Sequence, residues 1–345
     1  MDEDERAHVT LQDVAREANV SLATASRVLH GTARVRDDLR ERVLTAAGAL
    51  AYAPNAHAQA LARASSQTIG VICHDVSDPY FAAISRGVMR VAGEHDLLVM
   101  LASTFRDPAR EIAYAAALRA QRARAIVLIG SGFEDRSWER AMDAELGPYQ
   151  RAGGRVAVVS RHRSLRVDAV LPENRVGAAD LARALMSLGH RDFVVLTGPQ
   201  ALSTVADRLG GFRDTLAEAG VPLPAGQVIE AAFTRDGGHA AATEMLSRGL
   251  RPTCVFAVTD VMAIGALAAF REHGVSVPED VSLAGFDDIP IVADLTPALS
   301  TVALPLEAMG ERVTHLVTQK PRQRSRIERF PGEVVLRGST SRGPC

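Results

Sequence analysis

The side chains best suited to recognise another molecule lie near the start of the chain, in the segment DVAREANVSLATASRVLHG, residues 13–31. Arg27 carries a forked guanidinium that can bind a guanine edge through two hydrogen bonds. Thr24 adds a hydroxyl close by, while Ser26 and the upstream Thr10 suit phosphate oxygens. Together these residue types predict hydrogen bonds to base edges and phosphates, provided that one helix presents them to the same groove.

The same segment has the pattern of two short helices separated by a sharp turn. We expect helices over about residues 11–18 and 22–29, followed by a third over 36–50. Asn19 interrupts the helical pattern, because Asn accepts the left-handed conformation of a sharp turn more readily than most residues. Ser21 then caps the second helix. The apolar and small residues that would form a shared core are Val14, Ala15, Ala18, Val20, Ala25 and Val28.

This spacing predicts a helix-turn-helix, whose second helix enters the major groove and presents its first residues to base edges. The candidate DNA contacts on it are Ser21, Leu22, Ala23, Thr24, Ser26 and Arg27. The formal net charge of the chain is only -2, but between His8 and Arg63 seven arginines stand against five acids. Two helices that cross at alanines are also common in other helical domains, so the pattern alone leaves a purely structural interpretation open.

The segment AYAPNAHAQALAR, residues 51–63, predicts a turn and then a short Ala-rich helix. A helix of this length is unstable alone and should form only when it docks on a partner. Docked in a minor groove, Leu61 would insert as an apolar wedge, and the polar contacts would come from Asn55, His57 and Gln59. The alternative is a linker in which Leu61 packs on the domain that follows.

From Thr68 onward, apolar runs of strand length alternate with amphipathic helical stretches. The runs cover residues 68–73, 97–103, 125–131, 155–161, 193–199, 227–233, 254–260 and 281–288. Continuous apolar strands separated by helices predict parallel sheets covered on both faces. Two sets of four strands therefore predict an α/β core of two doubly wound lobes, with a ligand-binding cleft at the carboxyl ends of the strands.

Length and composition place the chain among ordinary globular proteins. Its 345 residues suggest two or three domains of about 150 residues, and 47% are hydrophobic against 23% charged. No apolar run approaches the ~18 residues of a membrane span, and the start MDEDER is unlike a signal peptide, so we expect a cytoplasmic protein without a membrane partner. The cysteines, Cys73, Cys254 and Cys345, stand in no metal-binding spacing and should be reduced.

The sequence offers little catalytic chemistry. It has no G-x-S-x-G elbow, P-loop or G-x-G-x-x-G motif, and its histidines show no metal-site spacing, so we expect no enzyme, no cofactor and no metal. Two alternatives stay open. A protein that stores or delivers a sugar would leave residues 1–65 unexplained, and a hydrolase has only Asp75 and Asp78, near the end of the first strand, in its favour.

In its ordered motifs the chain resembles the lactose and galactose repressor (LacI/GalR) family of bacterial transcription regulators. The likeness runs from Val9 to about Thr340. It rests on TLQDVAREANVSLATASRVLHG, RVLTAAGALAYAPNAHAQALA, IGVICHDVSDPYFAAISRGV, RLGGFRDTLAEAG, VTDVMAIGALAAFREHGVSVPEDVSLAGFDD, TPALSTVALPLEAMG and VVLRGST, in that order. The resemblance implies a repressor that acts as a homodimer on palindromic operator DNA, with paired hinge helices in the central minor groove and a periplasmic-binding-protein-like core.

The resemblance also implies a domain layout. A helix-turn-helix domain would cover 1–53, a hinge helix and linker 54–66, the core 67–340 and a tail 341–345. One lobe would take 67–165 and 297–327, and the other 166–296 and 328–340, with three crossings between them. The tail is too short for a coiled coil, which favours a dimer. An effector in the cleft would change the angle between the lobes and so pair or melt the hinge helices, as inducer or as corepressor.

Carried over position by position, the family pattern implies an effector site between the lobes. Tyr80 and Phe81 would line it from one lobe and Phe233 from the other. Arg208 would be the fixed polar anchor, and Asp287 would accept paired hydrogen bonds. These groups suit a sugar, a sugar phosphate or a nucleoside-like effector, since they match vicinal hydroxyls and a flat apolar face. Outside the family frame, ordinary packing and an ion pair are the better explanation.

The chain departs from the family pattern at positions that can face the effector. Ser160 stands where many members carry Asp, and Thr259 where many carry Asn. These changes weaken any specific sugar assignment and leave Arg161 or Asp260 as candidates to compensate. The first two residues of the second helix also replace polar or aromatic residues of many relatives, so the operator cannot be copied from one of them.

Overall fold

The computed structural model describes residues 9–30, 35–52, 67–130, 132, 135–160, 165–320 and 324–343. The chain divides into two compact units, Met1–Gln67 and Thr68–Cys345. The hinge candidates Asn55, His57, Gln59 and Leu61, and the effector candidate Arg161, lie outside the described residues.

The described residues of the first unit form a bundle of three helices, α1 (Leu11–Glu17), α2 (Leu22–His30) and α3 (Asp37–Ala49), as the sequence predicts. Its core uses small side chains, which let short helices approach closely enough to bury one another. The buried residues are Val14, Ala15, Ala18, Ala25, Val28, Val43, Ala46 and Ala47. Of the six predicted core residues, five are buried and Val20 is partly buried.

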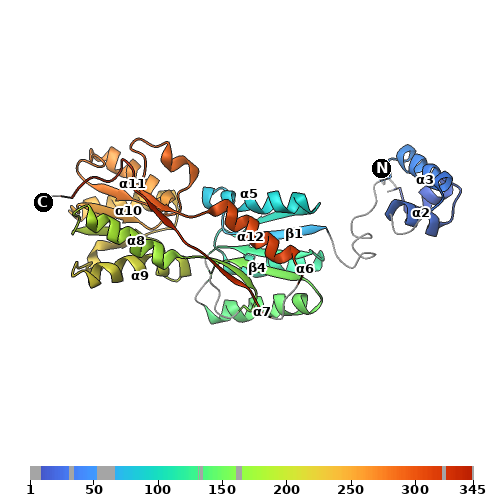
Figure 1. The fold of residues 1–345 in the computed structure, drawn as a ribbon, viewed down its shortest axis with the longest axis horizontal. Coiled ribbons are helices and arrows are strands. Elements are labelled where there is room, and N and C mark those ends of the chain that lie inside the picture. The colour runs from blue at the N-terminus through green and yellow to red at the C-terminus, as the bar shows by residue number, and fades with distance from the viewer. Residues whose placement is uncertain are drawn as a thin grey trace, which may run out of the picture. The chain divides into compact units, whose positions relative to one another are not determined.

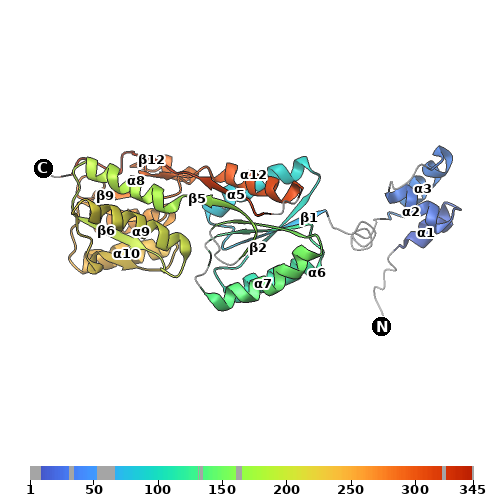
Figure 2. The ribbon, with the colours of Figure 1, turned by 60° about the horizontal axis from the view of Figure 1, so that its bottom comes forward.

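The second unit consists of two lobes, each a parallel sheet with helices on both faces (Figures 1 and 2). The first sheet has the order β11-β5-β4-β3-β1-β2. Its strands are β1 (Thr68–Cys73), β2 (Leu98–Ser103), β3 (Ala125–Ile129), β4 (Arg155–Val159), β5 (Asp168–Pro172) and β11 (Ile327–Phe330). One face carries α5 (Pro79–Glu94) and α12 (Leu306–Thr318), and the other α6 (Pro108–Ala120) and α7 (Arg136–Arg151), as Figure 2 shows. All residues of β3 are buried, as expected for a strand covered on both faces.

The second lobe repeats this design around a smaller sheet of order β7-β6-β8-β9. Its strands are β6 (Phe193–Thr197), β7 (Val228–Glu230), β8 (Cys254–Ala257) and β9 (Ser282–Ala284). Helices α8 (Asn174–Ser187) and α9 (Ser203–Glu218) pack together, as do α10 (Arg235–Ser247) and α11 (Asp260–Glu272). The predicted fold class of two doubly wound lobes is therefore confirmed.

The chain passes between the lobes after β5, before α12 and after β11 (Figure 1). Beside these crossings, β10 (Thr301–Ala303) pairs antiparallel with β12 (Glu333–Val335). The first sheet has six strands rather than the expected four, because β5 pairs with β4 and β11 pairs with β5. The expected lobe boundaries at 165 and 327 are therefore wrong, and the first lobe extends to Pro172 and to Phe330.

Local sequence explains where the helices that follow β1 and β2 begin. Asp78 caps α5 by accepting the Tyr80 N–H at 3.0 Å, and Asp107 caps α6 by accepting the Ala109 N–H at 2.9 Å. A proline follows each cap, at a helical position where its missing N–H costs nothing. These caps fix the loops at the carboxyl ends of the two strands.

Within the described residues, no helix combines the length and the apolar character that a membrane crossing requires.

Candidate functional site

The turn between α1 and α2 is built by Asn19 and fixed from α3. Asn19 has a left-handed φ of 48°, and the Thr24 N–H donates to Ser21 Oγ at 3.1 Å, which caps α2. Arg42 donates from Nη2 to the carbonyl oxygens of Ala18, at 2.6 Å, and Asn19, at 2.9 Å. Helix α2, the predicted reading helix of the helix-turn-helix, is therefore held at a fixed angle to α1.

Helix α2 leaves one face open to solvent. The predicted DNA contacts on it that are exposed are Ser21, Leu22, Ala23 and Arg27, and those that are half-buried are Thr24 and Ser26. Leu22 is 51% exposed, although leucine usually packs inside. Residues separated by about four positions share a helix face, so Ala23 and Arg27 present together the surface that a groove would meet.

Thr10 begins α1 instead of standing free. Its hydroxyl donates to Asp13 Oδ2 at 2.6 Å, and its Oγ1 accepts the Asp13 N–H at 3.3 Å. The hydroxyl hydrogen is thus already donated to a carboxylate, whose negative charge repels phosphate. This geometry does not support the predicted phosphate contact of the Thr10 side chain.

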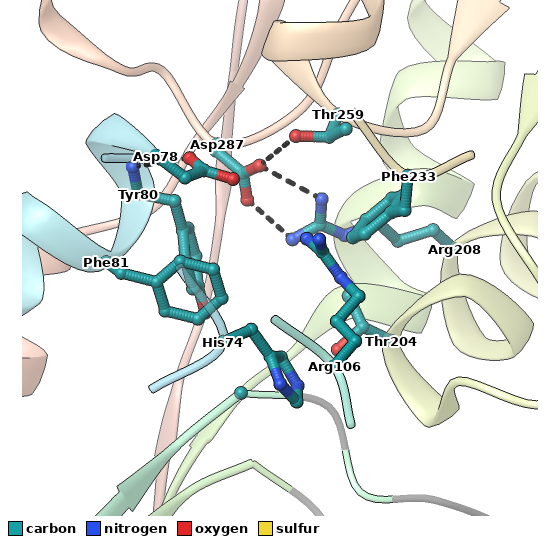
Figure 3. A pocket seen from close by; sticks show the side chains of 11 residues that line it. His74, Asp78, Tyr80, Phe81, Arg106, Thr204, Arg208, Phe233, Thr259 and Asp287 are labelled. Carbon is teal, nitrogen blue, oxygen red and sulfur yellow. Dashed lines mark hydrogen bonds and ion pairs between the residues drawn. The ribbon is translucent and has the colours of Figure 1, made fainter. Parts of the chain in front are cut away.

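In the second unit, a cavity lies where the strand ends of the two lobes face each other (Figure 3). The first lobe lines it with His74, Asp78, Tyr80, Phe81, Arg106 and Gly130, and the second with Thr204, Arg208, Phe233, Thr259 and Asp287. Nearly all of these residues follow the carboxyl end of a strand or begin the next helix, which is where open α/β sheets place their ligand sites.

A buried ion pair between Arg208 and Asp287 forms the polar part of this cavity (Figure 3). Arg208 donates from Nη2 to Asp287 Oδ1 at 2.5 Å and from Nη1 to Oδ2 at 3.2 Å, and the two side chains are 1% and 3% exposed. Arg208 also donates to Asn174 Oδ1 and to the Val258 carbonyl, and its guanidinium lies 3.9 Å from the centroid of the Phe286 ring. A guanidinium has five N–H donors, so one hydrogen on Nη2 remains for a ligand.

The backbone around Asp287 is unusual and tightly held. Its φ of 118° is rare for a residue other than glycine. The Asp287 N–H donates to the Val302 carbonyl at 2.9 Å, and its carbonyl accepts the Leu304 N–H at 3.3 Å, so β10 and the residue after it fix the position. The Thr259 hydroxyl donates to Asp287 Oδ2 at 2.7 Å. Thr259 therefore orients the carboxylate as well as lining the cavity.

Asp260 lies outside this cavity, contrary to its prediction as an effector contact. Its Oδ1 accepts the Thr301 hydroxyl at 2.6 Å, and its Oδ2 accepts the Ile289 N–H at 2.9 Å. Burial, and next the negative charge of Asp287, raises the pKa of Asp260 to about 7. Both oxygens are occupied inside the second lobe, so Asp260 ties the start of α11 to β10 and has no oxygen turned to a ligand.

Aromatic rings and one arginine complete the cavity. Tyr80 and Phe81 meet edge to face with centroids 5.1 Å apart, and Phe81 meets the His74 ring in the same way at 5.7 Å. From the first lobe, the Arg106 guanidinium carbon lies 5.2 Å from the centroid of the Phe233 ring in the second lobe. This cation–π contact joins the two sides of the cavity.

The carboxyl group of Asp78 titrates unusually late. Burial raises its pKa to about 6, and the negative charge of Asp287 acts in the same direction. Arg106 opposes that shift only in part. As the pH rises through about 6, Asp78 therefore adds one negative charge to the cavity.

Six of the nine predicted effector residues line this cavity, namely Tyr80, Phe81, Arg208, Phe233, Thr259 and Asp287. Ser160 lines a neighbouring cavity that shares Thr204 with the first. The other lining residues were not predicted as effector contacts, because each stands at a strand end, in a loop or at a helix start whose direction only the fold sets; they are His74, Asp78, Arg106, Gly130 and Thr204. In the described ranges, no three His, Cys, Asp or Glu side chains come together in a way that could hold a metal ion.

Known proteins share both parts of this arrangement. Residues 10–55 match the model described as bacterial regulatory proteins, lacI family, and residues 182–340 match a periplasmic binding protein-like domain. The HTH-type transcriptional regulator GalS of Salmonella typhimurium is 36% identical over 311 residues, which cover 90% of this chain and 89% of GalS. The chain belongs to the LacI family.

Solved structures agree with this membership of the LacI family. A complex of the transcriptional regulator CelR with cellobiose matches with a TM-score of 0.70 and 28% identity, over 96% of this chain and 99% of that one. The Lac repressor dimer bound to operator and the anti-inducer ONPF matches with a TM-score of 0.81 and 25% identity, over the same shares. This LacI-family chain is a DNA-binding transcriptional regulator, which argues against the storage-protein and hydrolase alternatives.

Proposed function

We propose that this LacI-family regulator represses a sugar or related catabolic operon and responds to a small molecule bound between its lobes. The observation that carries the proposal is the buried Arg208–Asp287 pair, which faces a cavity lined by both lobes. The Nη2 hydrogen of Arg208 and the oxygens of Asp287 offer a donor and acceptors to vicinal hydroxyls. The rings of Tyr80 and Phe233 can cover the apolar face of a sugar, a sugar phosphate or a nucleoside-like ligand. The cellobiose bound to CelR supports this class of effector.

The effector would act by changing the angle between the lobes. Arg106 and Phe233 reach the cavity from opposite lobes, so a ligand that displaces either group changes the free-energy difference between open and closed forms. Coupling of this kind is reciprocal. If the effector changes the affinity for operator DNA by a certain factor, typically 5- to 150-fold, operator DNA must change the affinity for the effector by the same factor. Inducer and corepressor action both satisfy this relation.

The DNA contacts belong to the same proposal. The exposed face of α2, above all Arg27, would read the bases of each half of a palindromic operator. The structure of the Lac repressor dimer bound to operator supports this arrangement. The segment with Asn55, His57, Gln59 and Leu61 would enter the central minor groove. Operator selection from random DNA, followed by titration of the hinge variant Leu61→Ala, tests this role through loss of affinity for the selected site.

We further propose that the regulator is a cytoplasmic homodimer. Exposed apolar side chains gather at the edge of the first sheet: Leu98 (66% exposed) and Met100 (37%) on β2, and Met89 (45%) on α5, which packs against β2. Contiguous exposed apolar residues mark protein interfaces. Sedimentation of Leu98→Asp tests the interface, since a charge in it should yield monomers that bind the operator more weakly.

A ligand screen followed by two matched variants tests the effector site. In a thermal-shift screen of sugars, sugar phosphates and nucleosides, a ligand at 100 times its dissociation constant adds about 2.7 kcal/mol to stability. Calorimetry with the best ligand then compares Phe233→Ala, which removes a cavity ring, with Phe105→Ala, which removes an exposed ring next to Arg106. We expect about a tenfold loss of affinity for the first and no loss for the second. Equal affinities of both variants and the wild type would place the effector elsewhere.

A further inference from the structure

All six strands of the first sheet are parallel, so their starts gather at one end of the lobe. We call this the entry end: the starts of β1, β2, β3, β4, β5 and β11 and the connections that lead into them. The Arg124 N–H donates to the Thr68 carbonyl at 2.8 Å, and the Arg155 N–H donates to the Arg124 carbonyl at 3.3 Å. The entry end lies away from the second lobe (Figures 1 and 2). It is also where the chain enters the core, because Thr68 follows the helix-turn-helix unit directly in sequence.

The entry end is strongly basic, although the chain as a whole is not. Its described residues include seven arginines and lysines, against two acids, Asp96 and Asp168. The opposite end of the same sheet, where the loops after β1, β2 and β3 begin the next helices, has the reverse sign. Its described residues carry four aspartates against the single cation Arg106. The excess of positive charge therefore belongs to the entry end and not to the first lobe as a whole.

Some of these cations serve the fold. Arg326 donates to Asp168 Oδ2 and to the Leu316 carbonyl at the end of α12, and Arg155 makes the same two contacts at longer distances. Helices α6, α7 and α12 all end here, and cations stabilise the partial negative charge of helix carboxyl ends. This structural role accounts for Arg155 and Arg326, which are half-buried and paired.

Three other cations have no such role. Arg122, Lys320 and Arg324 are exposed, and in the part of the chain that the structure describes none of them has an acidic partner or a hydrogen-bonded carbonyl. Like charges that gather without counter-charges repel one another, and that repulsion is relieved when an anionic surface approaches. Duplex DNA supplies such a surface, with one negative charge per about 1.7 Å of its axis.

We propose that the entry end of the first lobe binds phosphates of the DNA that flanks the operator, through Arg122, Lys320 and Arg324. The contact adds affinity without reading sequence, because phosphates look alike in every sequence. It gives the core its own hold on DNA, separate from the reading helix. The partner is the sugar–phosphate backbone of duplex DNA, because a LacI-family regulator binds duplex DNA.

The salt dependence of DNA binding tests this proposal. The variant Arg122→Gln/Lys320→Gln/Arg324→Gln removes three charges from the entry end. A control variant, Arg191→Gln/Arg213→Gln/Arg251→Gln, removes three charges from exposed arginines of the second lobe. The probe is a duplex of about 40 base pairs that carries an operator selected from random DNA at its centre, titrated over a range of salt concentrations. The slope of log affinity against log salt becomes shallower by about 0.9 for each phosphate that the protein no longer neutralises.

We expect the entry-end variant to bind more weakly at low salt, with a slope shallower by at least about 0.9, while its preference for operator over random duplex stays unchanged. The control variant should keep the wild-type slope. A charge-preserving variant, Arg122→Lys/Lys320→Arg/Arg324→Lys, should restore the slope, which separates a charge effect from a folding defect. Equal slopes for the wild type and the entry-end variant, or equally shallow slopes for the entry-end and control variants, would overturn the proposal.

Discussion

The carboxyl group of Glu111 offers the sharpest test of how burial and charge are balanced in this chain. Glu111 lies on α6, only 6% exposed, against the indole of Trp138 on α7. Burial raises its pKa to about 7, and the Trp138 indole offsets only part of that effect. The perturbation is Glu111→Gln, which keeps the shape of the side chain and removes the charge.

The sign and the size of the effect follow from linkage. Between the ordinary pKa of 4.5 and about 7, the folded chain keeps a proton on Glu111 that the unfolded chain has lost. The contribution of this group to the free energy of unfolding is therefore full below pH 4.5, falls as the pH rises, and is lost above pH 7. The difference between the two pKa values corresponds to about 3 kcal/mol, at about 1.4 kcal/mol per unit. Glu111→Gln should match the wild type at pH 4.5 and exceed it by up to about 3 kcal/mol at pH 8.

Urea unfolding followed by Trp138 fluorescence measures this, because Trp138 is the single tryptophan of the chain and its side chain interacts with Glu111. Glu94→Gln serves as the control, since Glu94 is exposed on α5 of the same lobe and its carboxylate already has water around it. A constant stability difference between Glu111→Gln and the wild type across this pH range would refute the reasoning. So would an equal pH-dependent gain in the control.

Three further outcomes follow from the contacts described above. Ser21→Ala should lower the free energy of unfolding of the helix-turn-helix unit by about 1 kcal/mol through loss of the cap on α2, measured by thermal denaturation, and an unchanged midpoint would contradict the capping role. Arg27→Ala should weaken binding to a selected operator by about 1–3 kcal/mol and relax base preference at one position, and unchanged operator affinity would remove Arg27 from the reading role. Arg208→Met should destabilise the core by about 3–5 kcal/mol, because it leaves Asp287 buried without its ion-pair partner. Adding Asp287→Asn should recover part of this loss, as urea unfolding would measure. A double variant less stable than Arg208→Met would contradict this.

The helix-turn-helix could be predicted because its signals are local. Asn19 and Ser21 set the turn and the cap within a few residues, and the small core residues recur at helical spacing. Arg42 could not be predicted, since its contacts with Ala18 and Asn19 join residues 23 and 24 positions apart.

The sheets show the same division between local and distant causes. The eight long apolar runs could be predicted as strands. Strands β10, β11 and β12 could not, nor could β5, which begins with an aspartate and ends with a proline. Strand β11, with the sequence IERF, has two adjacent charged residues at its centre, and it is a strand because β5 lies beside it. Its charged Glu328 is held by Arg312 of α12, a partner that the sequence of the strand does not announce.

At the cavity, residue types could be predicted and orientations could not. Thr259 and Asp260 are neighbours, yet the first lines the cavity and the second turns into the lobe, because Asp260 starts α11 and meets Thr301 and the Ile289 N–H there. Arg106 carries no motif of its own, and only the folding of both lobes brings it over Phe233.

The backbone that holds Asp287 has a mechanical consequence. Strand β10 and Leu304 after it bind the N–H and the carbonyl of Asp287. The strand ends at Ala303, and α12 of the first lobe begins at Leu306. Only two residues, Leu304 and Pro305, separate this strand from the first lobe's own helix. A ligand that pulled on the Asp287 carboxylate would therefore strain this covalent connection between the lobes as well as the contacts across the cavity. Such a signal would pass through the chain itself, along a connection of only two residues.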